Sequence, residues 1–283
     1  MRRGFRQRIG SVTLHLLAGL LFLWCVFPVY WMVNTSLLPN NETRGVTPHF
    51  YPSDPTLSNY HTVLFDESKA PFLPALRNSL MVTGFTVLVA VVLAFVAALA
   101  LTRFRFRGRR SFILLILVVQ MIPGEAMIVS TYQILDGWHL LNTIAGLTMV
   151  YIATVLPFTI WMLRGFVHGV PIELEEAAMI DGCSRAGAFW RVTFPLLAPG
   201  LVATGVFAFI QAWNEFLLAL VVNSRPEMMT LPVWLRTFQQ ATQATNWAAI
   251  MAGSTLMTIP VIVFFAFVQG RMTTGLVAGA VKG

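Results

Sequence analysis

The sequence predicts an all-α membrane protein that crosses the bilayer six times and keeps both termini in the cytosol. Three observations predict it: the composition, six apolar runs of spanning length, and the uneven placement of Lys and Arg. Of 283 residues, 57% are hydrophobic and 11% are charged, whereas soluble domains are roughly one quarter charged. This balance excludes an ordinary soluble domain. Since the basic residues behind the net charge of +7 flank apolar runs, they do not indicate nucleic-acid binding.

A membrane-spanning helix needs about 20 mostly apolar residues, and six stretches meet that requirement. The first follows an arginine-rich start, but it is too long for a signal peptide and no cleavage site follows it, so we expect it to be retained. Interruptions by proline are compatible with spans, because neighbouring helices satisfy the freed backbone groups. The predicted spans are residues 14–34, 76–101, 111–135, 144–163, 196–222 and 248–268.

The basic residues orient these spans. Fourteen of the 19 Lys and Arg residues fall in the segments on the same side as the termini, and five fall on the other side. The positive-inside rule therefore places both termini in the cytosol. One domain over residues 1–283 is the simplest partition. Its expected parts are a cytosolic N-terminus (1–13), the first span (14–34), an external loop (35–75), a five-span core (76–270) and a cytosolic tail (271–283).

Residues 171–195 form the cytosolic segment between the fourth and fifth spans, and their pattern predicts two short helices. Pro171 suits a first helical position, and glutamates follow it where the positive end of a helix dipole favours them. Gly182 is placed to end that helix, and Ser184 can cap the second. One face of the first helix combines small residues with a single carboxylate, at Leu174, Ala177, Ala178 and Asp181.

Two interpretations of this segment are open. Small residues allow another protein's backbone to approach closely, which indicates a docking element. The alternative is a hairpin that only packs on the membrane surface. The spacing itself is distinctive: Glu176–Ala178, three residues, Gly182, nine residues, then Val192–Pro195.

This spacing resembles the EAA motif of permeases in binding-protein-dependent ABC importers. The family motif ends in I-x-L-P, so Val192 and Phe194 depart from it conservatively. The resemblance extends over nearly the whole chain, and it is closest to carbohydrate-type permeases, specifically the second maltose permease. Further matching segments are Thr56, Asn59–Tyr60, Asn78–Ser79, Leu140–Thr143, Trp213–Glu215, Gly275–Leu276 and Gly279–Gly283.

The resemblance implies a type I ABC importer permease in the bacterial inner membrane, with residues 171–195 as its coupling loop. It implies several partners: two copies of an ATPase subunit, a second permease, membrane lipid and an extracytoplasmic solute-binding protein that residues 223–247 can contact. The apolar tail would reach toward the ATPase pair. The residues expected to couple to the ATPase are Glu176, Ala177, Ala178, Asp181, Gly182 and Pro195.

No sequence feature indicates chemistry on this chain. A phosphate-binding loop needs Gly-Lys followed by Ser or Thr, whereas the two lysines, Lys69 and Lys282, follow Ser68 and Val281. ATP and Mg²⁺ are therefore expected on the partner ATPase, and no cofactor on this chain. The five histidines lack metal-ligand spacing, so we expect no metal site and no catalytic residue. A membrane enzyme or scaffold would need a soluble domain or a catalytic constellation, and neither is recognisable.

Polar groups inside the predicted spans are candidates for a solute path or gate. On continuous helices Glu125 would lie about 21 Å, and Glu215 about 10 Å, from the nearer estimated span end, and intramembrane carboxyl groups usually face protein or water. Trp213 and Asn214 beside Glu215 suit a sugar, because they combine stacking with directional hydrogen bonds. Alternatively, Glu125 and Glu215 are structural or gate residues and the partner permease contacts most of the solute. A further alternative is that the two carboxyl groups relay ions in a secondary transporter. Gln120, Gln211 and Asn214 are candidates for interhelical hydrogen bonds.

Overall fold

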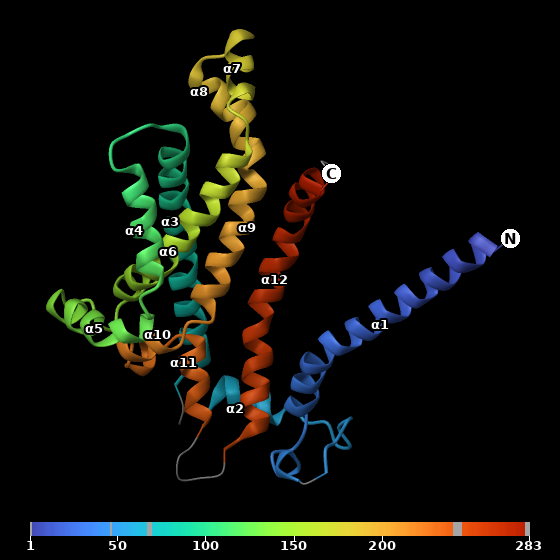
Figure 1. The fold of residues 1–283 in the computed structure, drawn as a ribbon. Helices are drawn as coiled ribbons and strands as arrows, with labels where there is room; N and C mark the ends of the chain where they lie inside the picture. Colours follow the sequence, from blue (N-terminus) through green and yellow to red (C-terminus); the bar gives the residue numbers. More distant parts are fainter. Residues whose placement is uncertain (1, 46, 67–69, 240–244, 281–283) are drawn as a thin grey trace. The chain divides into compact units, whose positions relative to one another are not determined.

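The computed structural model describes residues 2–45, 47–66, 70–239 and 245–280, and the side chains of 2–12, 44 and 271–280 are not described. Within these ranges every regular element is a helix, so the all-α prediction is confirmed (Figure 1). The chain divides into two compact units: 1–69 with 235–260, and 70–234 with 261–283. Each unit is described by itself below. The last three residues of the predicted tail lie outside the described residues.

Five helices are long and apolar enough to cross a membrane, and there are six candidate spans if one bent helix pair is counted as a span. This agrees with the predicted polytopic membrane protein. The helices extend beyond most predicted boundaries, because hydropathy marks only the apolar part of each. Candidate spans are Thr13–Ser36, Phe72–Arg103, Ile144–Gly169, Arg185–Trp213 and Trp247–Gly270, with Arg109–Gln120 plus Gly124–Gly137 as the bent pair.

The predicted span 111–135 is not one continuous helix. Helix α4 (Arg109–Gln120) ends before Pro123, and a 3₁₀ turn leads into α5 (Ile128–Gly137). The two parts meet at 89°. Pro123 explains the break, because a proline disfavours the helical conformation in the residue before it. The 21 Å depth expected for Glu125 assumed a continuous helix and is therefore wrong.

The predicted span 196–222 is interrupted as well. Helix α9 (Phe194–Trp213) ends just before Asn214, and α10 (Leu217–Val222) begins three residues later. The proline inside α9, Pro199, does not break the helix. The depth expected for Glu215 assumed one continuous helix, so it stays a prediction that this interruption does not support.

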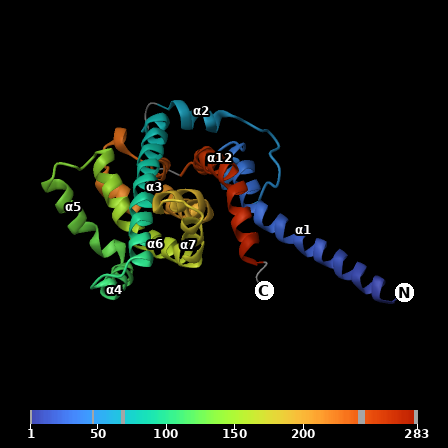
Figure 2. The same ribbon diagram turned by 90° about the horizontal axis from the view of Figure 1, so that it is seen from above.

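In the larger unit α3 (Phe72–Arg103), α6 (Ile144–Gly169) and α9 pack against one another (Figure 1 and Figure 2). Small residues bring them close together. Ala90, Ala94 and Ala98 repeat every four positions on α3 and are fully buried. A side-chain carbon on Gly200 of α9 would lie 2.5 Å from the ring of Phe166 on α6. Such close contacts drive helix association where lipid is as apolar as the side chains.

The same unit ends in short helices. At one end of α9 the 171–195 loop carries α7, α8 and a π-helical turn, and at the other end lie α10 and α11 (Figure 1). At the first end the bounds are α7 (Glu173–Ile180), α8 (Arg185–Ala188) and the π-helical turn (Phe189–Thr193). At the second end a 3₁₀ turn (Pro226–Met228) precedes α11 (Leu231–Leu235), whose last residue belongs to the smaller unit.

In the smaller unit, α1 (Arg2–Ser36) is followed by a loop that holds α2 (Ser58–Phe65). Asn59 Nδ2 donates to the carbonyls of Ser36 at 2.9 Å and Leu38 at 2.8 Å, so one amide fixes the chain as it leaves α1. None of the apolar window in Thr13–Ser36 is buried. The other elements here are the 3₁₀ turns Glu42–Arg44 and Arg236–Phe238 and the start of α12 (Trp247–Ala280).

Candidate functional site

The 171–195 loop projects from the helix bundle as two short helices, α7 and α8. Gly182 lies in the turn between them. Gly182 has φ +92°, in the left-handed region that side chains other than glycine rarely adopt. The Cys183 amide donates to the Ala178 carbonyl at 3.0 Å, and the Gly182 amide to the Met179 carbonyl at 3.1 Å. This is the Schellman pattern, which satisfies the last carbonyls of α7. The prediction that Gly182 ends the first helix is confirmed.

The second predicted cap is also confirmed. Ser184 precedes α8, and its Oγ accepts from the Gly187 amide at 3.1 Å. The start of the first helix differs slightly from the prediction: α7 begins at Glu173, two residues after Pro171. Helix ends commonly vary by this much.

The residues predicted to couple to an ATPase lie on this projection. No residue of α7 is buried, and the surface also presents large apolar side chains: Ile180 is 87% exposed and Trp190 is 60% exposed. Exposed apolar groups gathered on one projection indicate a protein or membrane contact. Of the six predicted residues, Glu176, Ala177, Asp181, Gly182 and Pro195 are exposed, and Ala178 is half-buried.

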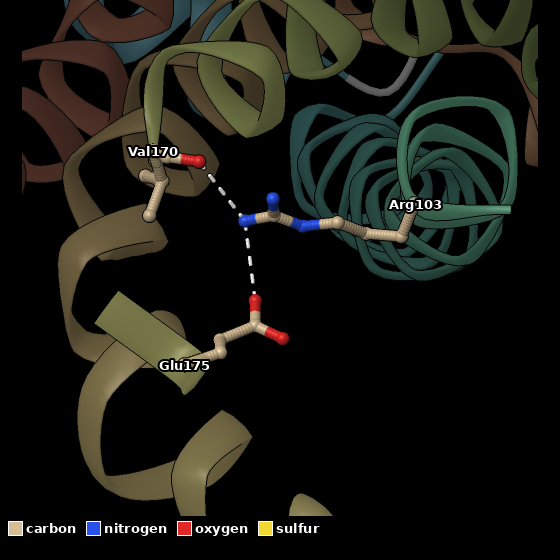
Figure 3. Close-up of polar contacts among 3 residues, drawn as sticks. All are labelled: Arg103, Val170 and Glu175. Atoms are coloured by element: carbon tan, nitrogen blue, oxygen red, sulfur yellow. Dashed lines mark hydrogen bonds and ion pairs between the residues drawn. The ribbon is translucent and has the colours of Figure 1, made fainter. Parts of the chain in front are cut away.

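One arginine anchors the entrance of the loop, and sequence reasoning missed its role. Arg103, the last residue of α3, places its guanidinium between the Val170 carbonyl, at 3.0 Å, and the Glu175 carboxylate, at 3.1 Å (Figure 3). The side chains of Arg103 and Glu175 are only 12% and 16% exposed. Arg103 is one of the fourteen basic residues on the side of the termini, but nothing in its sequence position distinguishes it from the neighbouring arginines.

The candidate solute-path carboxyl group of Glu215 is occupied by structural hydrogen bonds. Its two oxygens accept from the amides of Leu218 at 2.8 Å and Ala219 at 2.9 Å, which start α10. The Tyr151 hydroxyl donates to it at 2.9 Å from α6. Glu215 thus caps α10 and fastens the break after α9 to the neighbouring helix.

The other three candidates differ in exposure. Trp213 is buried and stacks on Phe209, with ring centroids 5.5 Å apart. Asn214 is exposed, and its amide donates back to the Ile210 carbonyl of its own helix at 2.8 Å. Glu125 is exposed in the break between α4 and α5. The four candidates therefore differ in burial and in hydrogen bonding.

A cavity of about 750 Å³ lies elsewhere in the larger unit, between α4, α5, α6 and α9. Its wall is mainly apolar and aromatic, with the amides of Gln120 and Gln211 and the hydroxyls of Thr131 and Thr154. None of the four predicted solute-path residues lines it. The two glutamines were predicted as interhelical hydrogen-bonding groups, and only the tertiary arrangement places them on a cavity wall. Within the described residues, no cluster of three His, Cys, Asp or Glu side chains is arranged to hold a metal ion.

Comparison with known proteins decides the family. The family model described as "binding-protein-dependent transport system inner membrane component" matches residues 90–276. The chain belongs to this family. The permease resemblance carried by the 171–195 loop is thereby confirmed, and so is the location in an inner membrane. The chain is the membrane component of the transport system and not its ATPase.

Curated relatives and solved structures extend this result. The diacetylchitobiose uptake system permease protein DasC of Streptomyces coelicolor is 45% identical over 278 residues, covering 98% of this chain and 99% of the relative. The trehalose/maltose transport system permease protein MalG of Thermococcus litoralis is 33% identical, covering 94% and 95%. The predicted likeness to carbohydrate-type permeases is confirmed.

For the fold, a crystal structure of a bacterial ABC transporter involved in import of the acidic polysaccharide alginate contains a similar chain. The two share a TM-score of 0.75 at 24% identity, over 93% of this chain and 96% of the other. At that identity the likeness shows the fold alone, and it confirms the predicted ABC importer permease architecture.

Proposed function

We propose that this permease translocates a sugar or sugar-like solute that an external binding protein delivers, and that the 171–195 loop couples it to separate ATPase subunits. The observation that carries the proposal is the exposed surface of that loop. Its caps close the turn between α7 and α8 with local hydrogen bonds, while its apolar groups, above all Ile180 and Trp190, remain uncovered. On the predicted cytosolic side, such a surface supports a protein partner, and we propose that this partner is an ATPase subunit.

The energy source belongs to a partner on this proposal. The sequence lacks the Gly-Lys pair of a phosphate-binding loop, so ATP and Mg²⁺ would bind the ATPase, in two copies. A second permease subunit and an extracytoplasmic binding protein complete the proposed complex. A second similar structure is that of a bacterial alginate ABC transporter in complex with an alginate pentasaccharide-bound periplasmic protein. That complex supports a binding-protein partner for this fold.

A sugar is favoured by two findings. The names of the two relatives above assign one to diacetylchitobiose uptake and the other to trehalose/maltose transport. The cavity of about 750 Å³ presents amides, hydroxyls and aromatic rings, and none of its lining residues is charged. Such a wall suits an uncharged, hydroxyl-rich solute, which needs directional hydrogen bonds and apolar contact. We therefore place the solute path beside Gln120 and Gln211 rather than at Glu215.

The proposal is tested by purifying the complex with its ATPase and binding protein and measuring uptake into vesicles. We expect uptake that requires ATP inside the vesicle and survives an uncoupler. The alternative, a secondary transporter that relays ions through Glu125 and Glu215, requires uptake by this chain alone, driven by an ion gradient. Ion-driven uptake without the ATPase would overturn our proposal, whereas the capping role of Glu215 already argues against the alternative.

A further inference from the structure

Helix α3 is one continuous helix that makes contacts at both ends of its unit. It runs for 32 residues, or about 48 Å at 1.5 Å per residue, which exceeds the roughly 30 Å hydrocarbon core of a bilayer. Its one proline, Pro74, lies in the first turn, where the missing amide hydrogen leaves no hydrogen bond unmade. By contrast, α6 carries Pro157 and α9 carries Pro199 in their interiors. Proline is a common cause of helix bending, and α3 has no proline beyond its first turn.

The predicted cytosolic end of α3 holds the entrance of the 171–195 loop. Arg103 contacts Val170, which caps α6, and Glu175, which lies in the first turn of α7 (Figure 3). One guanidinium thus bridges the three-residue joint, residues 170–172, between the membrane helix and the projection. Because both charged side chains are largely shielded from water, solvent screens their attraction less than it would at an exposed surface.

The same helix also contacts the exit of the loop. The Phe95 ring lies 6.2 Å from that of Phe189 in the π-helical turn and 6.1 Å from that of Phe194 at the start of α9. Since α3 touches the loop where it begins and where it returns, a displacement of the loop acts on α3 directly. The covalent connections to α6 and α9 are therefore not the only mechanical links.

The opposite end of α3 holds the segment that follows α10. Asn78 Nδ2 donates to the carbonyls of Glu227, at 2.8 Å, and Met229, at 3.1 Å. Ser79 Oγ accepts from the Leu231 amide at 2.7 Å. Asn78 and Ser79 are buried, whereas Glu227 itself is exposed. Two side chains of α3 thus fix the backbone of a segment predicted to face outward.

We propose that α3 is the rod that transmits movement between the 171–195 loop and the segment 226–231, with Arg103 and Asn78 as positioning residues at its two ends. The inference rests on the proposed function, because it requires an ATPase on the loop and a binding protein on the outer side. It goes further by assigning the link to one helix and to two named contacts. Neither Arg103 nor Asn78 lines the cavity of the proposed solute path.

The cytosolic contact is tested in the complete complex with Arg103→Gln and Glu175→Gln. Each substitution removes the ion pair while keeping a polar side chain. We expect normal assembly and an unchanged basal ATPase rate, but about a five-fold or greater loss of the stimulation by loaded binding protein, the scale of a typical coupling between sites. The matched controls Arg107→Gln and Glu173→Gln remove an exposed charge nearby, and we expect them to keep full stimulation.

The double variant separates a pair from two independent effects. If Arg103 and Glu175 act together, the combined substitution costs no more stimulation than either single one. Full stimulation in the single variants, or a double loss equal to the two single losses combined, would overturn the assignment. Should Arg103→Gln fail to assemble, Glu175→Gln decides, because its side chain lies on the projection outside the packed helices.

The outer contact is tested by Asn78→Ala, with Asn214→Ala as the control on an exposed amide. We expect Asn78→Ala to lower stimulation by loaded binding protein several-fold while ATPase subunits still co-purify. Unchanged stimulation would remove the outer end from the proposal. If the ATPase does not co-purify even with the unaltered chain, the proposed function fails. If the ATPase co-purifies and the Arg103 and Asn78 variants keep full stimulation by loaded binding protein, the α3 inference fails and the proposed function stands.

Discussion

Two breaks in the helices of this permease, at Gly182 and at Glu215, are held by different means. At Gly182 every hydrogen bond that closes the turn comes from within a few residues. At Glu215 the local bonds to Leu218 and Ala219 are joined by a hydroxyl from Tyr151, which is 64 residues away. The first break stands out from the bundle and the second is packed within it. A locally closed turn can serve as an independent docking element, whereas a turn held by a neighbouring helix serves the bundle.

The comparison also assigns different roles to chemically identical groups. The carboxylate of Glu176 is exposed on the projection, where a partner can reach it. The carboxyl group of Glu215 instead accepts hydrogen bonds from Tyr151, Leu218 and Ala219 of the same chain. Surroundings, and not residue type, therefore decide which acidic groups are available for function.

The largest effect is expected for Gly182→Val. A β-branched residue at φ +92° is strained by about 1–3 kcal/mol, so the turn between α7 and α8 should reshape and ATP-driven uptake should fall roughly ten-fold or more. Gly108→Val is the control, because Gly108 has φ +89° but lies outside the loop. Equal loss of uptake in both variants, at equal amounts of assembled complex, would contradict a docking role for Gly182.

Next in size is the effect of Glu215→Ala on stability. Removing a group that accepts three hydrogen bonds should lower the free energy of unfolding by about 3 kcal/mol, measured as a lower thermal midpoint in detergent. Glu215→Gln keeps one carbonyl acceptor, so we expect a smaller loss and continued ATP-driven uptake. A stable Glu215→Gln protein that cannot transport would show instead that the carboxyl group acts in transport.

A smaller effect is expected for Gln211→Leu, which tests the cavity as the solute path. Loss of one hydrogen bond to a sugar costs about 1 kcal/mol, so the solute concentration for half-maximal uptake should rise about five-fold. Asn214→Ala should leave that concentration unchanged, because Asn214 does not line the cavity. If Asn214→Ala raised that concentration and Gln211→Leu did not, the solute path would lie at residues 213–215 instead.

The smallest effect is expected for Ser184→Ala. An N-cap serine contributes about 1 kcal/mol to the helix it starts, so the Gly187 amide should exchange its hydrogen faster while uptake falls only slightly. Hydrogen exchange followed by mass spectrometry measures this. Unchanged exchange would mean that packing against α7, and not the cap, stabilises α8.

Several sequence segments that matched the family only weakly now have a physical explanation. Asn59, Asn78 and Asn142 each use a side-chain amide to hold backbone from another segment. Asn142 Oδ1 accepts from the Arg225 amide at 2.8 Å, across 83 residues. Their role could not be predicted from the sequence, because the partners are backbone groups, which every residue carries.

The sequence by itself determined the membrane class, the helical content, the caps of the 171–195 loop and the family, because hydropathy, caps and motif spacing all act over short stretches of chain. It did not determine that Pro123 and Glu215 mark breaks, that Gln120 and Gln211 line a cavity, or that Arg103 holds Glu175. Those facts depend on which helices lie side by side, since an arginine at a helix end finds its partner only when the chain returns. The tertiary structure therefore decided which polar residues bind the chain to itself and which remain available to partners and solute.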